Sequence, residues 1–323
     1  MARHRAMAAL LTLALAGGSG CGGDDEPREP GRFFAADGVW NEPLRKDAPV
    51  SDRSRELVAE LRRQADGAGA YINTTEYSTP VYRVGRRQRP VKVTLDTVYP
   101  PLQRALRSVP VPAGARPAAG SDRHMVIWQP STNTMWELWL ARRRRDGWHA
   151  RWGARIRNAS RNPGWIRAPL GATATGLPLA GGLMRAAEVR SRRIRHALAF
   201  ALPEARAGAF TLPARRTDGQ VQSGLAVPLG TRFRLDPDLD LGELGLPKPT
   251  LAIARAVQRY GMIARDKAGA VVFYGEAPKP GRANPWPAAF GGATPDQLLE
   301  RFPWDRLEVV RAPVRTAPGA ASR

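Results

Sequence analysis

The chain has 323 residues, a net charge of +21 at neutral pH and a hydrophobic fraction of 43%. That fraction is enough for a packed core, so a wholly disordered chain is excluded. A single cysteine and four histidines exclude a disulfide framework and disfavour metal sites built from these residues, so we expect no metal and no cofactor.

The chain begins with the pattern of an export signal. Basic residues precede an apolar run over residues 6–16, which is too short for a membrane span. Small residues then lead to Cys21, which resembles the lipidation site of bacterial lipoproteins, although Gly18 stands where such sites carry leucine. We favour removal of residues 1–20 and acylation of Cys21, which predicts a chain anchored on the outer face of the cytoplasmic membrane. The alternative is ordinary cleavage after Ala16, which predicts a secreted chain.

The positive charge does not by itself indicate a nucleic-acid partner. Almost all of the basic residues are arginines scattered along the chain, and this bias, with many alanines, glycines and prolines, is typical of a GC-rich genome. Export would also separate the protein from nucleic acid. We therefore expect no nucleic-acid binding, and attraction to anionic lipid or acidic wall polymers instead.

Stretches rich in glycine and proline divide the rest of the chain. They predict a flexible tether over residues 21–32, one domain over residues 33–311 and a disordered tail over residues 312–323. Helices are expected over residues 51–64, 101–107, 249–259 and 295–301. Strands are expected over residues 79–84, 91–95, 124–129, 135–140, 148–155, 262–265 and 270–274, and residues 194–202 form either a strand or a buried helix.

Many short strands at turn-rich spacing favour a mainly β fold. The expected architecture is an antiparallel β-sandwich with a few peripheral short helices. Residues 124–129 and 135–140 are expected to pair as a hairpin, and residues 262–265 and 270–274 as a second one. No break in composition divides the domain, and we expect a monomer.

Several stretches between about residues 70 and 277 together resemble uncharacterised secreted proteins of actinobacteria. They are YINTTEYSTPVY (71–82), HMVIWQPSTNTMWELW (124–139), GATATGLPLAGG (171–182), HALAFALP (196–203) and RFRLDPDLDL (232–241). The resemblance implies a concanavalin-A-like jelly roll. That fold hosts lectins, glycosidases and polysaccharide lyases alike, so the resemblance assigns no catalytic residue.

The predicted hairpin over residues 124–140 carries the candidate ligand site. If its turn is centred on Thr132, then Gln129, Glu137 and Trp139 share one face of the hairpin. A sugar offers C–H patches to an indole and hydroxyls to a carboxylate or an amide. These three side chains are therefore the predicted ligand-binding residues.

The other face of this hairpin is apolar and is expected to pack in the core through Trp128 and Trp136. A slip of one residue in the register would move Gln129 to the face opposite Glu137. It would leave Glu137 and Trp139 together, because they are two residues apart on one strand. The plain alternative is an edge hairpin on which Glu137 is merely solvated.

His196 lies within an apolar run, where a hydrogen-bonded core histidine is the default interpretation. The alternative is a general base near Glu137. Glu137 and His196 are thus the candidate catalytic residues if the protein is an enzyme.

Three functions remain open from the sequence. The favoured one is a non-catalytic protein that binds an acidic or neutral glycan or wall polymer. The second is a polysaccharide lyase or glycoside hydrolase, although ordinary glycosidases need two carboxylates and the sequence offers one good candidate, Glu137. The third is a structural envelope protein with no small ligand.

Overall fold

The computed structural model describes residues 32–317. Cys21, the predicted signal, nearly all of the predicted tether and the last six residues of the predicted tail lie outside this range. Residues 314–316, which belong to the predicted tail, form strand β16 (Val314–Thr316). This strand pairs antiparallel with β10 (Ala205–Thr211), so that part of the tail is ordered against the fold.

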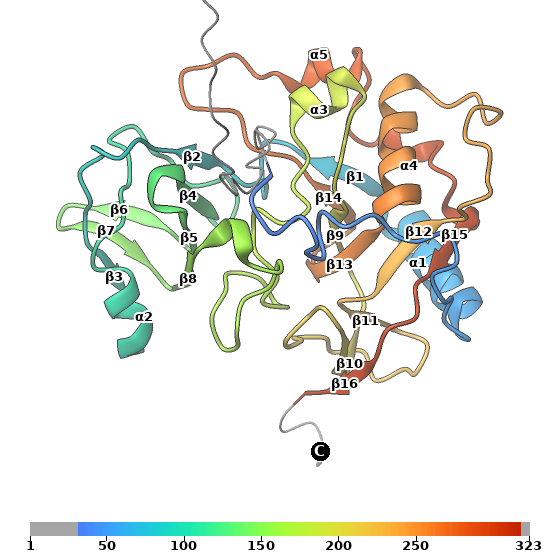
Figure 1. Cartoon of the computed structure of the whole chain (residues 1–323), viewed down its shortest axis with the longest axis horizontal. Coiled ribbons are helices and arrows are strands. Elements are labelled where there is room, and N and C mark those ends of the chain that lie inside the picture. Colours follow the sequence, from blue (N-terminus) through green and yellow to red (C-terminus); the bar gives the residue numbers. More distant parts are fainter. Residues whose placement is uncertain (1–31, 318–323) are drawn as a thin grey trace, which may run out of the picture. The chain divides into compact units, whose positions relative to one another are not determined.

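The largest sheet has six strands in the order β1-β14-β9-β13-β12-β15 (Figure 1). The pairs β1/β14 and β9/β13 are parallel, and the other neighbours are antiparallel. The six strands are β1 (Ala70–Asn73), β9 (Leu198–Leu202), β12 (Arg232–Leu235), β13 (Met262–Lys267), β14 (Val271–Tyr274) and β15 (Leu307–Val309).

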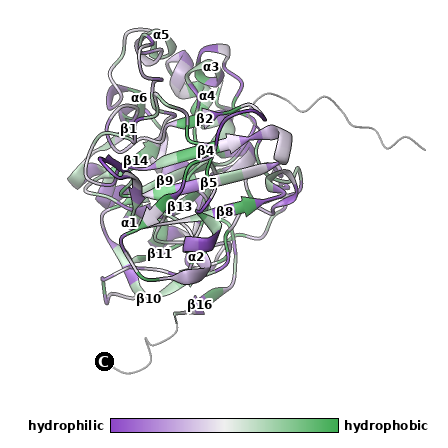
Figure 2. Cartoon of the chain, turned by 90° about the vertical axis from the view of Figure 1, so that its left-hand side faces the viewer, coloured by the Kyte–Doolittle hydropathy of each residue, from purple (hydrophilic) through white to green (hydrophobic). Residues whose placement is uncertain are grey.

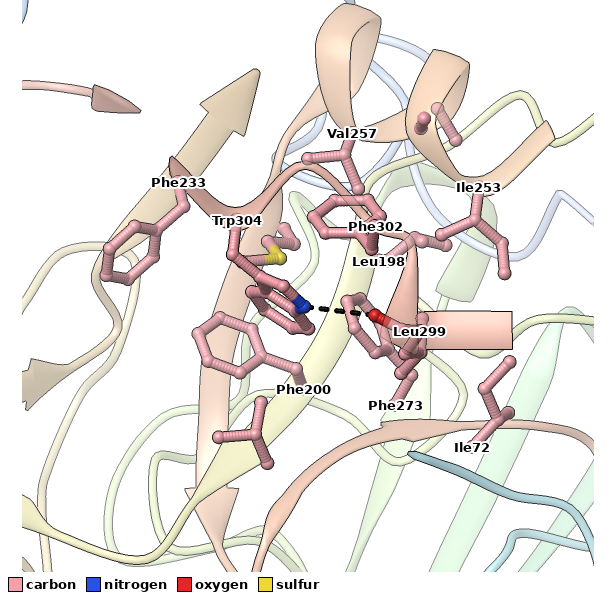
Figure 3. Packing of buried hydrophobic residues seen from close by; sticks show 14 of the residues in the cluster. Ile72, Leu198, Phe200, Phe233, Ile253, Val257, Phe273, Leu299, Phe302 and Trp304 are labelled. Carbon is pink, nitrogen blue, oxygen red and sulfur yellow. Dashed lines mark hydrogen bonds between the residues drawn. The ribbon is translucent and has the colours of Figure 1, made fainter. Parts of the chain in front are cut away.

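Strand β9 shows how this sheet is covered on both faces. Leu198, Phe200 and Leu202 belong to a core cluster with apolar side chains of helices α1 (Ser54–Ala68) and α4 (Lys248–Tyr260). Figure 3 shows this packing around Phe200, Phe273 and Trp304. The alternate residues Ala199 and Ala201 belong to a second cluster on the opposite face. Small side chains there let neighbouring backbone approach closely: a Cβ added to Gly182 would lie 2.3 Å from the backbone nitrogen of Ala199.

A four-stranded sheet, β2-β4-β5-β8, contributes to the second cluster. Strand β4, which is largely hydrophobic in Figure 2, is buried along its whole length and separates β2 from β5. The other face of this sheet joins a third cluster with α2 and the sheet β3-β7-β6. The bounds are β2 (Val81–Arg83), β3 (Val93–Leu95), α2 (Pro100–Ala105), β4 (Met125–Gln129), β5 (Thr134–Trp139), β6 (Arg142–Arg144), β7 (Gly147–Ala150) and β8 (Trp152–Arg157).

A third small sheet has the order β11-β10-β16, with β11 at Val227–Leu229. The remaining helices are short. They are α3 (Ala186–Ser191), α5 (Trp286–Phe290), α6 (Gln297–Glu300) and the 3-10 helices η1 (Pro130–Thr132), η2 (Ala159–Arg161) and η3 (Trp304–Arg306).

The predicted antiparallel jelly-roll sandwich is wrong. The fold is α/β, with four small sheets, each of which contains at least one parallel pair. The error has a physical reason: short strands look alike in sequence whether their neighbours are parallel or antiparallel. The clue lay in residues 198–202 (LAFAL), which are apolar without interruption, as in a strand that is covered on both faces by other layers.

The second predicted hairpin is also wrong. Strands β13 and β14 follow each other in sequence, but both pair with β9, which lies between them. Residues 194–202 contain this β9 strand rather than a buried helix. A short turn between two strands is therefore no proof that they are neighbours in the sheet.

Candidate functional site

The β4–β5 hairpin forms, but its register differs by one residue from the predicted one. Val126 pairs with Glu137, and Gln129 pairs with Thr134. Gln129 therefore lies on the face opposite Glu137, which is the slipped arrangement. Glu137 and Trp139 remain on one face. The physical cause is the 3-10 turn η1 with Asn133 in the left-handed conformation (φ 48°), which closes the hairpin between residues 129 and 134.

The same register separates two tryptophans that were expected to share a face. Trp128 packs in the cluster shared with the large sheet, whereas Trp136 packs in the cluster on the other side of its own sheet. Both rings are buried, with 8% and 6% exposed. The prediction that both are core residues is thus correct, but the prediction of a common face is wrong.

Glu137 is wholly buried and binds backbone rather than facing solvent. Its carboxylate accepts hydrogen bonds from the backbone N–H of Ala172 at 2.7 Å and of Leu179 at 2.9 Å. Burial raises the pKa of Glu137, and these two hydrogen bonds and the charges of Arg265 and Arg216 oppose that effect. Glu137 therefore anchors the glycine-rich segment over residues 171–179.

Two arginines hold the same segment through its carbonyl groups. Arg265 is wholly buried and donates to the carbonyl of Leu179 at 2.8 Å and of Gly181 at 3.1 Å, while its guanidinium lies 4.0 Å from the ring centre of Tyr274. Arg216 donates to the backbone carbonyls of residues 169, 170, 171, 173 and 174. The segment is thus fixed by charged groups from β5, β13 and the loop before residue 217.

The fixed segment forms one wall of a cavity of about 430 Å³, a volume within the range of small-molecule sites. Trp139 and Trp152 are directly paired across β5 and β8, and both line this cavity. Because they pair across neighbouring strands, their side chains project from the same face of the sheet. The site thus offers two indole rings from neighbouring strands, of which Trp152 also packs on Tyr99, with 5.1 Å between ring centres, and donates its indole N–H to the Pro169 carbonyl at 3.0 Å.

Polar side chains line the same cavity. Asp122 accepts a hydrogen bond from the indole nitrogen of Trp139 at 3.4 Å. His124 is buried, and its Nδ1 has no partner among residues 32–317. Burial lowers the pKa of His124 to about 4, with Arg265 acting in the same direction and Asp122 against it, so the imidazole is neutral at pH 7. A neutral imidazole with a free nitrogen can accept or donate a hydrogen bond to a ligand hydroxyl.

Asp266 is the most perturbed carboxyl group of the cavity. It follows a register irregularity between β13 and β9, and one of its oxygens accepts hydrogen bonds from the backbone N–H of Lys267 and Ala174. Burial raises the pKa of Asp266 to about 7, although Arg265 opposes this. Tyr274 lines the same cavity, and burial, together with the Asp266 charge, raises its pKa as well. Asp266 can therefore exchange a proton near neutral pH.

The remaining predicted site residues lie elsewhere. Gln129 lines a different cavity, on the other face of the hairpin. His196 precedes β9, and its Nε2 lies 3.3 Å from the carboxylate of Glu188 in α3. Burial raises the pKa of Glu188, but His196 and Arg185 outweigh this and lower it to about 2. The structure therefore brings Trp139 to the cavity, places Glu137 behind its wall, and joins His196 to Glu188.

Sequence reasoning missed Trp152, Asp122 and Asp266. Trp152 lay inside the single strand predicted over residues 148–155, whereas the structure divides this stretch into β7 and β8, and β8 begins at Trp152 and pairs with β5. Asp266 carries a weaker signal, because it stood in a predicted hairpin turn that does not exist. Only the tertiary structure shows that Asp266 is partly buried in the cavity wall.

No protein-family model, no curated protein and no solved structure matches this chain. Within residues 32–317, no helix is long and apolar enough to cross a membrane. The same residues contain no cluster of three or more histidine, cysteine, aspartate or glutamate side chains that could hold a metal ion. The site is therefore interpreted from its own geometry.

Proposed function

We propose that this protein binds a glycan in the cavity lined by Trp139 and Trp152. The observation that carries the proposal is the direct cross-strand pair of these two indoles beside Asp122 and Asp266. Indole rings pack against the C–H faces of sugar rings, and carboxylates accept hydrogen bonds from sugar hydroxyls. A narrow apolar slot would lack these acceptors, and a purely charged pocket would lack the stacking surface.

The charges around the cavity fit an acidic or neutral glycan. Lys267 lines it together with the aspartates, so both signs of charge are available to a sugar ring and its substituents, whereas the guanidinium of Arg216 is occupied by five backbone carbonyls. The net charge of +21 would also attract acidic wall polymers.

The proposed location agrees with such a ligand. We infer that the chain is exported and held by a lipid on Cys21 at the outer face of the cytoplasmic membrane, or secreted if cleavage occurs before that residue. In either place it would meet envelope polysaccharides. Cys21 lies outside the described residues, so this part of the proposal stands on the sequence pattern alone.

A second candidate function is hydrolysis or elimination on the same glycan. It is favoured by the presence of two aspartates, Asp266 and Asp122, in one cavity. Asp266 can carry a proton near pH 7, and Asp122 is only partly buried. Glycoside hydrolases use two carboxyl groups, one of which holds a proton at neutral pH. In that case Asp266 would be the general acid, and Asp122 the base or nucleophile.

One screen distinguishes these functions. The full chain is incubated with a panel of acidic and neutral polysaccharides, and both retention on the immobilised polymer and release of reducing ends or unsaturated sugars are measured. Retention without release supports binding alone. Release that is lost in Asp266→Asn, while retention persists, supports the enzyme. Neither retention nor release on any polymer would contradict the proposed function and favour a structural role.

A further inference from the structure

A second cavity, of about 330 Å³, lies on the opposite face of the four-stranded sheet. Its position follows from the strand register: Trp136 pairs with Arg155, and Thr134 pairs with both Gln129 and Arg157. All of these side chains therefore project from one face, away from Glu137 and Trp139. Every one of them lines the cavity.

This cavity is rich in cationic groups and has no acid to balance them. Arg86, Arg155 and Arg157 contribute guanidinium groups, and no acidic residue is among those that line it. Within residues 32–317 none of these three side chains takes part in an ion pair. In contrast, Arg142 in the neighbouring small sheet lies 2.7 Å from Asp96, and Arg234 lies 3.0 Å from Glu308. The lining of this cavity therefore carries three positive charges with no acidic residue beside them.

Arg155 and Arg157 also repel each other. They are two residues apart on β8 and point to the same face, and Arg155 is half-buried. Burial lowers the pKa of Arg155, and the charge of Arg157 lowers it further. An anion between the two side chains would remove this unfavourable interaction.

The neutral groups of the cavity supply further donors. The ring of Trp136 is 6% exposed, and its indole N–H is buried without a hydrogen-bond partner among the described residues. A buried donor without a partner costs free energy, so a ligand acceptor at this point would be favourable. Thr132 and Ser108 bring hydroxyls to the same lining.

We propose that this second cavity binds a phosphate group. Three guanidinium groups match a multiply charged oxyanion better than a singly charged carboxylate, because each can donate two parallel hydrogen bonds to oxyanion edges. The volume accommodates a phosphate monoester, which carries up to two negative charges, either of a small soluble molecule or of a phosphatidic acid headgroup. This proposal is independent of glycan binding on the other face.

The test uses calorimetric titration of the full chain with inorganic pyrophosphate at constant ionic strength. Wild type is expected to bind one equivalent. Arg157→Gln, which alters an exposed side chain, and Arg155→Gln should each weaken binding at least about tenfold, while Trp136→Phe should weaken it a few-fold. Arg255→Gln removes the same charge from an exposed position on α4 and should bind like wild type.

Competition then identifies the source of the phosphate. Displacement of pyrophosphate by soluble glycerol 3-phosphate indicates a soluble phosphate monoester, and displacement only by vesicles containing phosphatidic acid indicates a lipid headgroup; both support a phosphate site. Three results would overturn it: no binding to wild type, equal loss in Arg255→Gln and Arg157→Gln, or equal affinity in wild type and both β8 variants. Far-ultraviolet circular dichroism of each variant verifies that it is folded.

Discussion

Glu137 and Arg265 bind the same backbone residue, Leu179, and both are wholly buried. Glu137 accepts a hydrogen bond from the Leu179 N–H at 2.9 Å, and Arg265 donates one to the Leu179 carbonyl at 2.8 Å. The segment between the two main sheets is therefore held at one residue by a buried carboxyl group and a buried guanidinium group. The cavity wall depends on this arrangement.

Removing the carboxylate should strongly destabilise the fold. Glu137→Ala leaves the buried backbone N–H groups of Ala172 and Leu179 without an acceptor, so we expect a loss of about 3–5 kcal/mol in the free energy of unfolding. Urea denaturation measures it. Glu243→Ala, at an exposed loop position, should change stability by less than about 0.5 kcal/mol. Equal midpoints for the two variants would show that Glu137 is not an anchor.

The loss of stability on replacing a tryptophan by alanine should depend on how deeply its ring is buried. Trp128→Ala removes a buried ring and should cost about 3–5 kcal/mol. Trp139→Ala should cost clearly less, because that ring is only partly buried at the end of β5. Chemical denaturation of both variants tests this order, and the reverse order would mean that Trp139 is a core residue rather than part of a ligand surface.

Asp266 should make stability fall as the pH rises. Burial raises its pKa from 3.8 to about 7, so between these values the folded chain binds more protons than the unfolded chain. The contribution of this group to the free energy of unfolding then decreases with rising pH, by at most about 1.4 kcal/mol per unit, and levels off above pH 7. His124, whose pKa is lowered to about 4, gives the opposite slope between pH 4 and its unfolded value of 6.5.

The relevant quantity is therefore the difference between wild type and Asp266→Asn. Asparagine keeps an oxygen that accepts from the backbone N–H of Lys267 but cannot titrate. Urea denaturation at several values between pH 4.5 and 7.5 should show the variant gaining stability relative to wild type as the pH rises. A constant difference across this range would mean that Asp266 titrates near its ordinary value.

Cys21 should be acylated in a bacterial host. A fatty-acid analogue is expected to label the wild-type chain and not Cys21→Ser, because the thiol is the only attachment point that the lipoprotein pattern provides. Labelling of both chains, or of neither, would remove the lipid anchor from the proposed location.

The sequence predicted local structure better than topology. The sequence could predict the two long helices, the β4–β5 hairpin and strand β9, because each depends on the periodicity of a short segment. The order of the strands could not be predicted, because the position of β9 between β13 and β14 depends on contacts between segments that lie far apart in sequence.

In the candidate site, too, local relationships could be predicted from the sequence and long-range contacts could not. Glu137 and Trp139 share a face whatever the register, and this local inference holds in the structure. The role of Glu137 could not be predicted, because its partners Ala172 and Leu179 lie more than 30 residues away, with separations of 35 and 42. The same limit applies to Asp266, whose burial results from packing rather than from its neighbours in sequence.

The most direct test of the account is a calorimetric titration of one glycan from the binding screen into four chains: wild type, Trp139→Ala, Trp152→Ala and Trp165→Ala. Trp165 is also partly buried but stacks on Arg215 outside the cavity lining, so it is the matched control. Loss of either cavity indole should weaken binding by about 1–3 kcal/mol, or roughly tenfold to more than a hundredfold, while Trp165→Ala binds like wild type. Unchanged affinity in both cavity variants, or an equal loss in the control, would contradict glycan binding at this site.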